Sequence, residues 1–139
     1  MRLSKTSEYA LRIFSFMIND NKQVYSAKYL VENLEIPEKY LRNLLTKLTK
    51  VHLIKSIKGR DGGFVFAKNA DKITLSEIVD AVEGMKKYEK CILGFDHCDE
   101  KNPCALHSRW KPIKDRILDF LNNTTVADLK KDKEENIRY

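Results

Sequence analysis

Apolar residues recur at helical spacing through roughly the first fifty positions of the chain. The first such stretch covers 4–19, and its apolar side consists of Tyr9, Ala10, Ile13, Phe14 and Met17. The second follows Ser26, a side chain that caps helix starts well, and its apolar side consists of Ala27, Leu30, Val31 and Leu34. The third covers 37–51 and opens on Pro37, because proline is favoured in the first turn of a helix. The pattern therefore predicts three successive helices.

The third predicted helix has one apolar side and one basic side. Its apolar side consists of Leu41, Leu44, Leu45, Leu48 and Val51. The rest of its surface carries the residues that we expect to contact DNA: Lys39, Tyr40, Arg42, Asn43, Thr46, Lys47 and Lys50. Two short helices joined by a tight turn, the second of them basic outside, are typical of a helix-turn-helix. The second helix of that motif, here called the recognition helix, lies in the major groove of DNA.

A tight hairpin is predicted directly after the recognition helix. The stretch 53–67 contains two β-prone runs, and three glycines lie between them within the five positions 59–63. Glycine supplies the positive φ angles that such a turn needs. Lys58 and Arg60 fall near the tip of this hairpin. A hairpin in this place is a wing, and a basic wing tip is suited to the minor groove of DNA, where arginine is favoured.

The positive charge of the chain is concentrated in this same region. Between positions 37 and 60, seven basic residues face the single acid Glu38, an excess equal to the net charge of +6 for the whole chain. A local excess of this kind is the electrostatic footprint of a protein that binds a polyanion such as double-stranded DNA. On charge alone, a solvated helix face is an equally good interpretation, so the order of helix, helix and wing decides for DNA.

Two further helices are predicted after the wing. The first lies between Thr74 and Gly84, where Thr74 and Glu77 have the spacing of a capping box. The second has the apolar stripe Trp110, Ile113, Ile117, Phe120 and Leu121, with Pro112 early in the helix or at a kink. We expect this late stripe to pair with a second copy in a homodimer, because helix-turn-helix proteins usually read two half-sites. The alternative is packing against its own domain.

All three cysteines of the chain lie within one polar loop. Cys91, Cys98, Cys104 and His107 have the spacing C-x6-C-x5-C-x2-H. Three thiolates and an imidazole suit zinc, another soft transition metal or an iron–sulfur cluster. The tight C-x2-4-C pairs of structural zinc sites are missing, and the wider spacing favours a larger cofactor. Three free cysteines without any ligand are the alternative, and His97 is either a surface residue or a competing ligand.

Length and composition restrict the class of protein. The 139 residues are 42% hydrophobic and 33% charged, which suits one modest core and excludes neither DNA binding nor regulation. No apolar run approaches the roughly 20 residues that span a bilayer. A signal peptide is not expected, because Glu8 and Arg12 interrupt the apolar start. We therefore expect a cytoplasmic protein with reduced thiols and no contact with membranes. The sequence offers no acid–base set for an enzyme.

The motifs together resemble the iron–sulfur transcription regulators of the IscR and NsrR type, an Rrf-type winged helix-turn-helix family. The resemblance covers nearly the whole chain, from "MRLSKTSEYAL" through "IPEKYLRNLLTKLTKVHLIKSIKGRDGGF" to "CALHSRW". It implies a dimer whose long C-terminal helices cross, and a 2Fe-2S or 4Fe-4S cluster held by the three cysteines. His107 matches the fourth ligand of the cluster-biogenesis regulator. Glu8 matches the acidic ligand that nitric-oxide sensors take from the partner subunit.

Two departures limit what the resemblance transfers. The first cysteine spacing is one residue longer than is usual in these regulators. On the recognition helix, Lys39 and Arg42 replace the Ser and Glu with which the biogenesis regulator reads bases. Because Glu accepts from cytosine whereas Arg donates to guanine, the operator sequence cannot be carried over.

The sequence thus predicts a mostly helical α+β protein in four parts. These are a winged helix-turn-helix at 1–84, a cluster-binding loop at 85–107, a dimerisation helix and terminal turn at 108–129, and a disordered tail at 130–139. The predicted function is a transcription regulator, repressor or activator, whose cluster senses nitric oxide, redox poise or iron–sulfur status. The alternatives are the same DNA-binding unit with structural zinc, a metal-free thiol switch, or a winged adaptor that leaves the basic helix unexplained.

Overall fold

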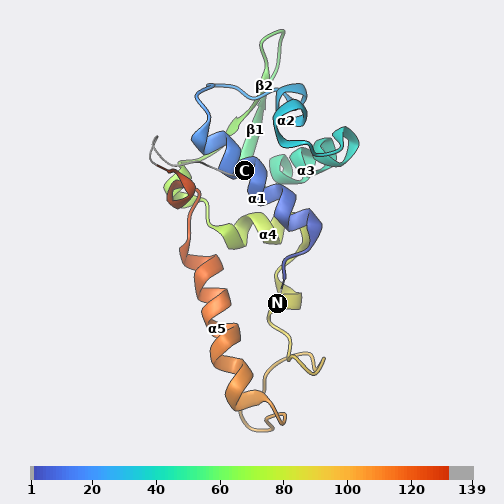
Figure 1. Cartoon of the computed structure of the whole chain (residues 1–139), viewed down its shortest axis with the longest axis vertical. Helices are drawn as coiled ribbons and strands as arrows, with labels where there is room; N and C mark the ends of the chain where they lie inside the picture. Colours follow the sequence, from blue (N-terminus) through green and yellow to red (C-terminus); the bar gives the residue numbers. More distant parts are fainter. Residues whose placement is uncertain (1, 132–139) are drawn as a thin grey trace.

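The elements follow the predicted order over residues 2–131, the part of the chain that the computed structural model describes (Figure 1). The longer elements are α1 (Lys5–Asn19), α2 (Ala27–Leu34), α3 (Glu38–Lys50), β1 (Ile54–Ile57), β2 (Gly63–Phe66), α4 (Leu75–Glu83) and α5 (His107–Asn123). Single 3-10 turns are η1 (Ala70–Lys72), η2 (Lys86–Tyr88) and η3 (Ala127–Leu129). The mostly helical winged helix-turn-helix is confirmed. Most of the predicted tail, from position 132, lies outside the described residues.

The predicted helix caps are present. The hydroxyls of Ser26 and Thr74 accept the N–H groups of residues three positions on, at the starts of α2 and α4. The capping box at α4 is only half formed, because the Glu77 carboxylate pairs with Lys68 at 2.6 Å. Helix α3 starts one residue later than predicted, with Pro37 as its N-cap. Local chemistry therefore determines where these helices start.

The core lies where helices α1 to α4 meet. The apolar sides of the first four helices contribute its largest fully buried side chains, including Phe14, Leu30, Leu41 and Ile78. One predicted core residue is wrong: the Val51 side chain is 49% exposed. Helix α3 ends at Lys50, and the chain turns away through His52 at a φ of 60°. Val51 therefore leaves the buried face of the helix.

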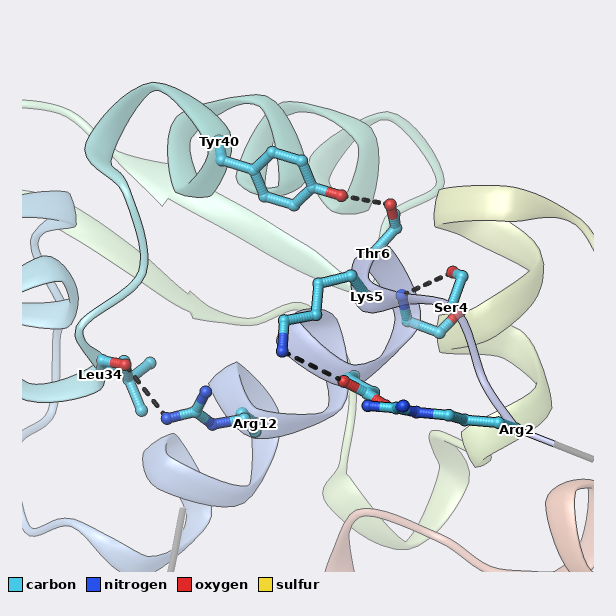
Figure 2. Close-up of polar contacts among 9 residues, drawn as sticks. Arg2, Ser4, Lys5, Thr6, Arg12, Leu34 and Tyr40 are labelled. Atoms are coloured by element: carbon cyan, nitrogen blue, oxygen red, sulfur yellow. Dashed lines mark hydrogen bonds and ion pairs between the residues drawn. The ribbon is translucent and has the colours of Figure 1, made fainter.

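The turn of the helix-turn-helix is held from α1. Glu35 ends α2 in the left-handed region, at a φ of 54°. The guanidinium of Arg12 donates a hydrogen bond of 3.1 Å to the carbonyl of Leu34, next to that residue (Figure 2). This contact ties the end of α2 to α1.

The wing is attached to the loop between α1 and α2. Strands β1 and β2 pair antiparallel from Ile54–Phe66 to Ile57–Gly63, which confirms the predicted hairpin. In addition to this strand pairing, the backbone of Phe64 exchanges hydrogen bonds of 3.0 and 2.8 Å with the backbone of Tyr25. The hairpin therefore projects from the helical unit as a supported wing, visible at the top of Figure 1.

Helix α5 extends away from the DNA-binding unit (Figure 1). Its predicted stripe divides between two directions, because Leu121 is buried and Ile117 packs against the core. Ile113 and Phe120, by contrast, are 52% and 58% exposed. Packing against the chain's own domain thus accounts for only part of the stripe, and Pro112 lies inside the helix.

Candidate functional site

The recognition helix α3 presents a polar surface opposite its buried leucines. Five of the seven residues predicted to contact DNA from this helix are exposed: Lys39, Arg42, Asn43, Thr46 and Lys50. The Arg42 guanidinium lies 3.0 Å from the Glu38 carboxylate, one turn earlier, and both side chains are exposed. A surface pair of this kind is worth about 0–1 kcal/mol. Arg42 can therefore exchange Glu38 for a base or phosphate at little cost.

Tyr40 and Lys47 make contacts inside the protein. The Tyr40 hydroxyl shares a short hydrogen bond with the Thr6 hydroxyl of α1 (Figure 2). Its ring packs edge-on against Tyr9, with centroids 5.4 Å apart. The Lys47 ammonium donates to the carbonyl of Val82, near the end of α4, at 3.3 Å. These two side chains hold α3 against its neighbours, a role that the sequence pattern did not indicate.

The wing and α2 add further cations to the same region. Lys58 and Arg60 are exposed at the hairpin tip, as predicted. Lys28 was missed by the sequence reasoning, although it is exposed in the first turn of α2. The Tyr25–Phe64 pairing brings the start of α2 beside the wing. The sequence did carry a signal for this residue. A basic residue just after a helix cap lies at the N-terminus of a helix, where phosphate binds favourably.

The cysteine loop closes around one cavity of about 330 Å³. Its lining includes the three thiols of Cys91, Cys98 and Cys104 and the imidazole of His107, with the exposed His97 beside them. The sulfur atoms of Cys91 and Cys104 lie 3.3 Å apart. Cys91 is buried, and the other two thiols are half-buried. The fold thus brings together the four residues that the sequence grouped by spacing.

Backbone groups make the Cys91 thiol more acidic than its partner. The N–H of Leu93 lies 3.4 Å from the Cys91 sulfur, and a turn is closed by the Gly94 N–H on the Cys91 carbonyl. The hydrogen bond from the Leu93 N–H outweighs the effect of burial and, with the Cys104 thiol, lowers the pKa of Cys91. The hydrogen bond with Cys91 raises the pKa of Cys104. Of these two thiols, Cys91 is therefore the one that more readily becomes a thiolate, the form that binds metal.

The two candidate fourth ligands lie in different surroundings. His107 is the first residue of α5, and its Nδ1 atom is buried without a hydrogen-bond partner among the described residues. Glu8, in the first turn of α1, pairs with Arg2 at 3.2 Å and Lys5 at 3.7 Å. Of these two residues, His107 lines the cysteine cavity of the same chain, whereas Glu8 lies outside the lining of that cavity.

The donor set is compatible with an iron–sulfur cluster. Between Arg2 and Lys131, no three His, Cys, Asp or Glu side chains are close enough together to hold one ion. A cluster is larger and is bound by cysteine thiolates, which suits three thiols spread around a cavity. The orphaned His107 nitrogen is a further unpaired donor at its edge. These residues therefore fit the group that the resemblance implies.

Comparison with known proteins places the chain in a family. A family model described as Rrf2, iron-dependent transcriptional regulator, matches residues 3–132. The chain belongs to the Rrf2 family. It is 34% identical over 131 residues to an HTH-type transcriptional regulator of Aquifex aeolicus, covering 93% of this chain and 91% of the relative. Its identity to IscR of Pectobacterium atrosepticum is 30%, covering 96% and 82%.

The fold of this Rrf2 protein matches solved relatives. The structure of CymR, the global cysteine regulator of Bacillus subtilis, superposes with a TM-score of 0.77 at 27% identity, covering 93% and 95% of the two chains. This Rrf2 protein is therefore a transcriptional regulator, and its relatives are regulators rather than enzymes. Within the described part, none of the helices has the length and apolar character needed to cross a membrane.

Proposed function

We propose that this Rrf2 protein is a homodimeric, cytoplasmic DNA-binding regulator whose operator affinity is controlled by an iron–sulfur cluster. Cys91, Cys98 and Cys104 would hold the cluster, and His107 would complete its ligands. The observation that carries the proposal is the single cavity lined by three thiols and an imidazole with an unpartnered buried nitrogen. When bound, a cluster supplies a redox-active and chemically labile centre, open to nitric oxide, redox poise or cluster supply.

The chain's own groups prepare this site. The Leu93 N–H stabilises the Cys91 thiolate, and α5 fixes His107 at its first residue. The exposed cations of α3 and the wing (Lys39, Arg42, Lys50, Lys58 and Arg60) would bind the DNA, with Asn43 and Thr46 between them on α3. Sensor and reader therefore lie in separate parts of one chain, joined through α1, α4 and α5.

Anaerobic purification tests the proposal directly. The protein should be brown, with a visible charge-transfer spectrum and stoichiometric iron and sulfide. A colourless protein containing zinc would replace the cluster by a structural metal. A colourless protein without metal would leave the metal-free thiol switch as the proposed role of the cysteines.

Substitution of the two candidate fourth ligands should give different results. His107→Ala should change the cluster spectrum and speed cluster loss, because it removes an imidazole that lines the cavity. Glu8→Ala should leave both unchanged, because Glu8 pairs with Arg2 and Lys5. Absorption and circular dichroism spectra of the anaerobic proteins measure this. The opposite pattern would make Glu8, from the partner subunit, the ligand.

A metal-free thiol switch is the second candidate, favoured by the sulfur separation of 3.3 Å between Cys91 and Cys104. A disulfide is about 2.05 Å long, so a small movement would close one. Hydrogen peroxide would oxidise the two thiols to the disulfide, taking up their two protons and two electrons, and would itself be reduced to two molecules of water. Mass spectrometry of metal-free protein treated with peroxide should then detect a Cys91–Cys104 peptide pair. Reduced thiols under these conditions would exclude this candidate.

The exposed face of α5 should hold the proposed dimer together. Phe120→Asp would bury a charge in that interface, which is costly without a partner, and should give monomers in light scattering. Phe120 is 58% exposed in the single chain, so the change spares the domain core. Phe120→Leu is the control and should remain dimeric. A dimeric Phe120→Asp variant with unchanged melting would move the interface elsewhere.

A further inference from the structure

A buried polar cluster joins α4, α1 and the segment that leads into the cysteine loop. Tyr88 is only 3% exposed and lies in η2, three positions before Cys91. Its hydroxyl donates a short hydrogen bond to the carboxylate of Glu83, the last residue of α4. The ammonium of Lys87 lies 3.2 Å from the same carboxylate. The Glu83 carboxylate thus holds the loop entrance, the segment 86–90 that leads into the cysteine loop, against α4.

The fourth member of this cluster is Ser7 on α1. Its hydroxyl is fully buried and has no hydrogen-bond partner among the described residues, yet it lies near enough to the Glu83 carboxylate to help lower the pKa of Glu83. Burial alone would raise the pKa of Glu83. The hydrogen bond from Tyr88, with the nearby Ser7 hydroxyl and the Lys87 ammonium, outweighs it and lowers that pKa. Glu83 is therefore a carboxylate held between three segments, where charge-assisted hydrogen bonds are strong.

The next residue along α1 continues the connection to the DNA-reading surface. Thr6 precedes Ser7, and its hydroxyl shares the hydrogen bond with Tyr40 on α3 (Figure 2). Tyr40 also packs against Tyr9, one turn further along α1. The start of α1 is therefore bonded to the recognition helix on one side and lies against Glu83 on the other.

The loop entrance is also held from the other direction. The ammonium of Lys114, a buried residue of α5, donates to the carbonyl of Glu89 at 3.2 Å. Glu89 directly follows Tyr88 and lies two positions before Cys91. We therefore expect a shift of Cys91 to displace Tyr88, which lies three positions earlier in the same segment. Displacing Tyr88 would leave the Glu83 carboxylate short of a donor, which is expensive for a buried charge.

We propose that the Tyr88 hydroxyl and the Glu83 carboxylate are positioning groups that transmit a change at the cysteine loop to recognition helix α3, through Ser7 and Thr6 of α1. The proposal rests on the proposed function, because it requires DNA affinity to differ between two states of the cysteines. These contacts would be the physical route by which the state of the cysteines and the affinity for DNA are coupled.

Removal of one hydroxyl tests this inference. The DNA is a duplex selected from a random pool by the wild-type protein, and its Kd is measured twice, for anaerobically cluster-reconstituted protein and for reduced, metal-free protein. The ratio of the two Kd values should be about 5–150 for the wild type, the usual range of allosteric coupling. Tyr88→Phe keeps the buried ring and should bring the ratio close to one, with the cluster spectrum unchanged.

Tyr29→Phe is the matched control. The Tyr29 hydroxyl donates to the Asp20 carboxylate at 3.2 Å, so the variant loses the same kind of hydrogen bond away from the cysteine loop. It should lose similar stability in thermal melting but keep the wild-type ratio. A merely structural role of Tyr88 would therefore leave the two variants alike.

Each outcome separates the inference from the function on which it rests. A wild-type ratio of one would overturn the proposed cluster control itself. A large wild-type ratio that Tyr88→Phe preserves would overturn only the coupling through Glu83. Should Tyr88→Phe fail to fold, Thr6→Val breaks the Tyr40 contact instead and should reduce the ratio in the same way. A Thr6→Val protein with the full wild-type ratio would then overturn the inference.

Discussion

Raising the salt concentration from roughly 50 to 200 mM should weaken duplex binding by about 10³–10⁵-fold, if the dimer neutralises six to ten phosphates. Lys39 and Lys50 on α3, with Lys58 and Arg60 on the wing, are exposed cations in each copy. Every phosphate they neutralise releases counterions, so log K should fall linearly with log salt, with a slope of about −0.9 per contact. Fluorescence anisotropy over a salt series measures this slope.

Two variants separate phosphate contacts from base reading in this experiment. Lys50→Ala should weaken all sequences similarly and reduce the salt slope by about one for each subunit. Arg42→Ala should relax preference at one base position by about 1–3 kcal/mol. A salt response that is flat, or identical behaviour of the two variants, would contradict the assignment of α3 as the DNA-reading helix.

Gly63→Ala should detach the wing and destabilise the protein. Gly63 has a φ of 155°, and a Cβ atom there would lie 2.5 Å from the carbonyl oxygen of Tyr25 and 2.8 Å from the backbone nitrogen of Ser26. These are backbone atoms that cannot rotate away, so the paired hydrogen bonds between Phe64 and Tyr25 should break. We expect a loss of about 2–3 kcal/mol in the free energy of unfolding, with weaker DNA binding.

Gly59→Ala is the control for backbone strain. Gly59 also has a positive φ, 114°, but a Cβ atom there meets no atom within 4 Å. This variant should lose only the strain of a left-handed alanine, about 1–2 kcal/mol, and keep its wing attached. Urea unfolding and DNA binding of both proteins measure the difference. Equal losses in both would show that the close approach to Tyr25 has no energetic weight.

The DNA-binding unit was predictable because its signals are local. Ser26 and Thr74 satisfy backbone N–H groups three positions away, and two of the three hairpin glycines, Gly59 and Gly63, adopt positive φ angles. Tertiary contacts were not predictable in this way. Tyr40 and Lys47 have the spacing of surface residues, yet they bond to α1 and α4. Helical periodicity states which side of a helix a residue is on, but not what lies beyond it.

The cysteine site was predicted in its members but not in its geometry. Spacings of six and five residues leave the path of a loop open, so the sequence could not place Cys91 and Cys104 with their sulfur atoms 3.3 Å apart. The sequence likewise left the choice between His107 and Glu8 open. In the fold, His107 lines the cavity of its own chain and Glu8 on α1 pairs with Arg2, and the ligand itself stays a prediction. The split of the α5 stripe depends on where the helix leaves the core, which no periodicity encodes.

Helix α5 and the cysteine loop project from the helical unit, so local opening of the loop is separate from unfolding of the helical core. The loop carries exposed apolar side chains such as Ile92 and Phe95, whereas the helical core around Phe14 and Leu30 is fully closed. A region with few buried contacts opens locally at a much lower free energy than the whole domain. Backbone amides of the loop should therefore exchange with solvent far sooner than those of α1 and α4. The cysteine loop would therefore be able to lose and regain its proposed cofactor while the DNA-reading half of the chain stays folded.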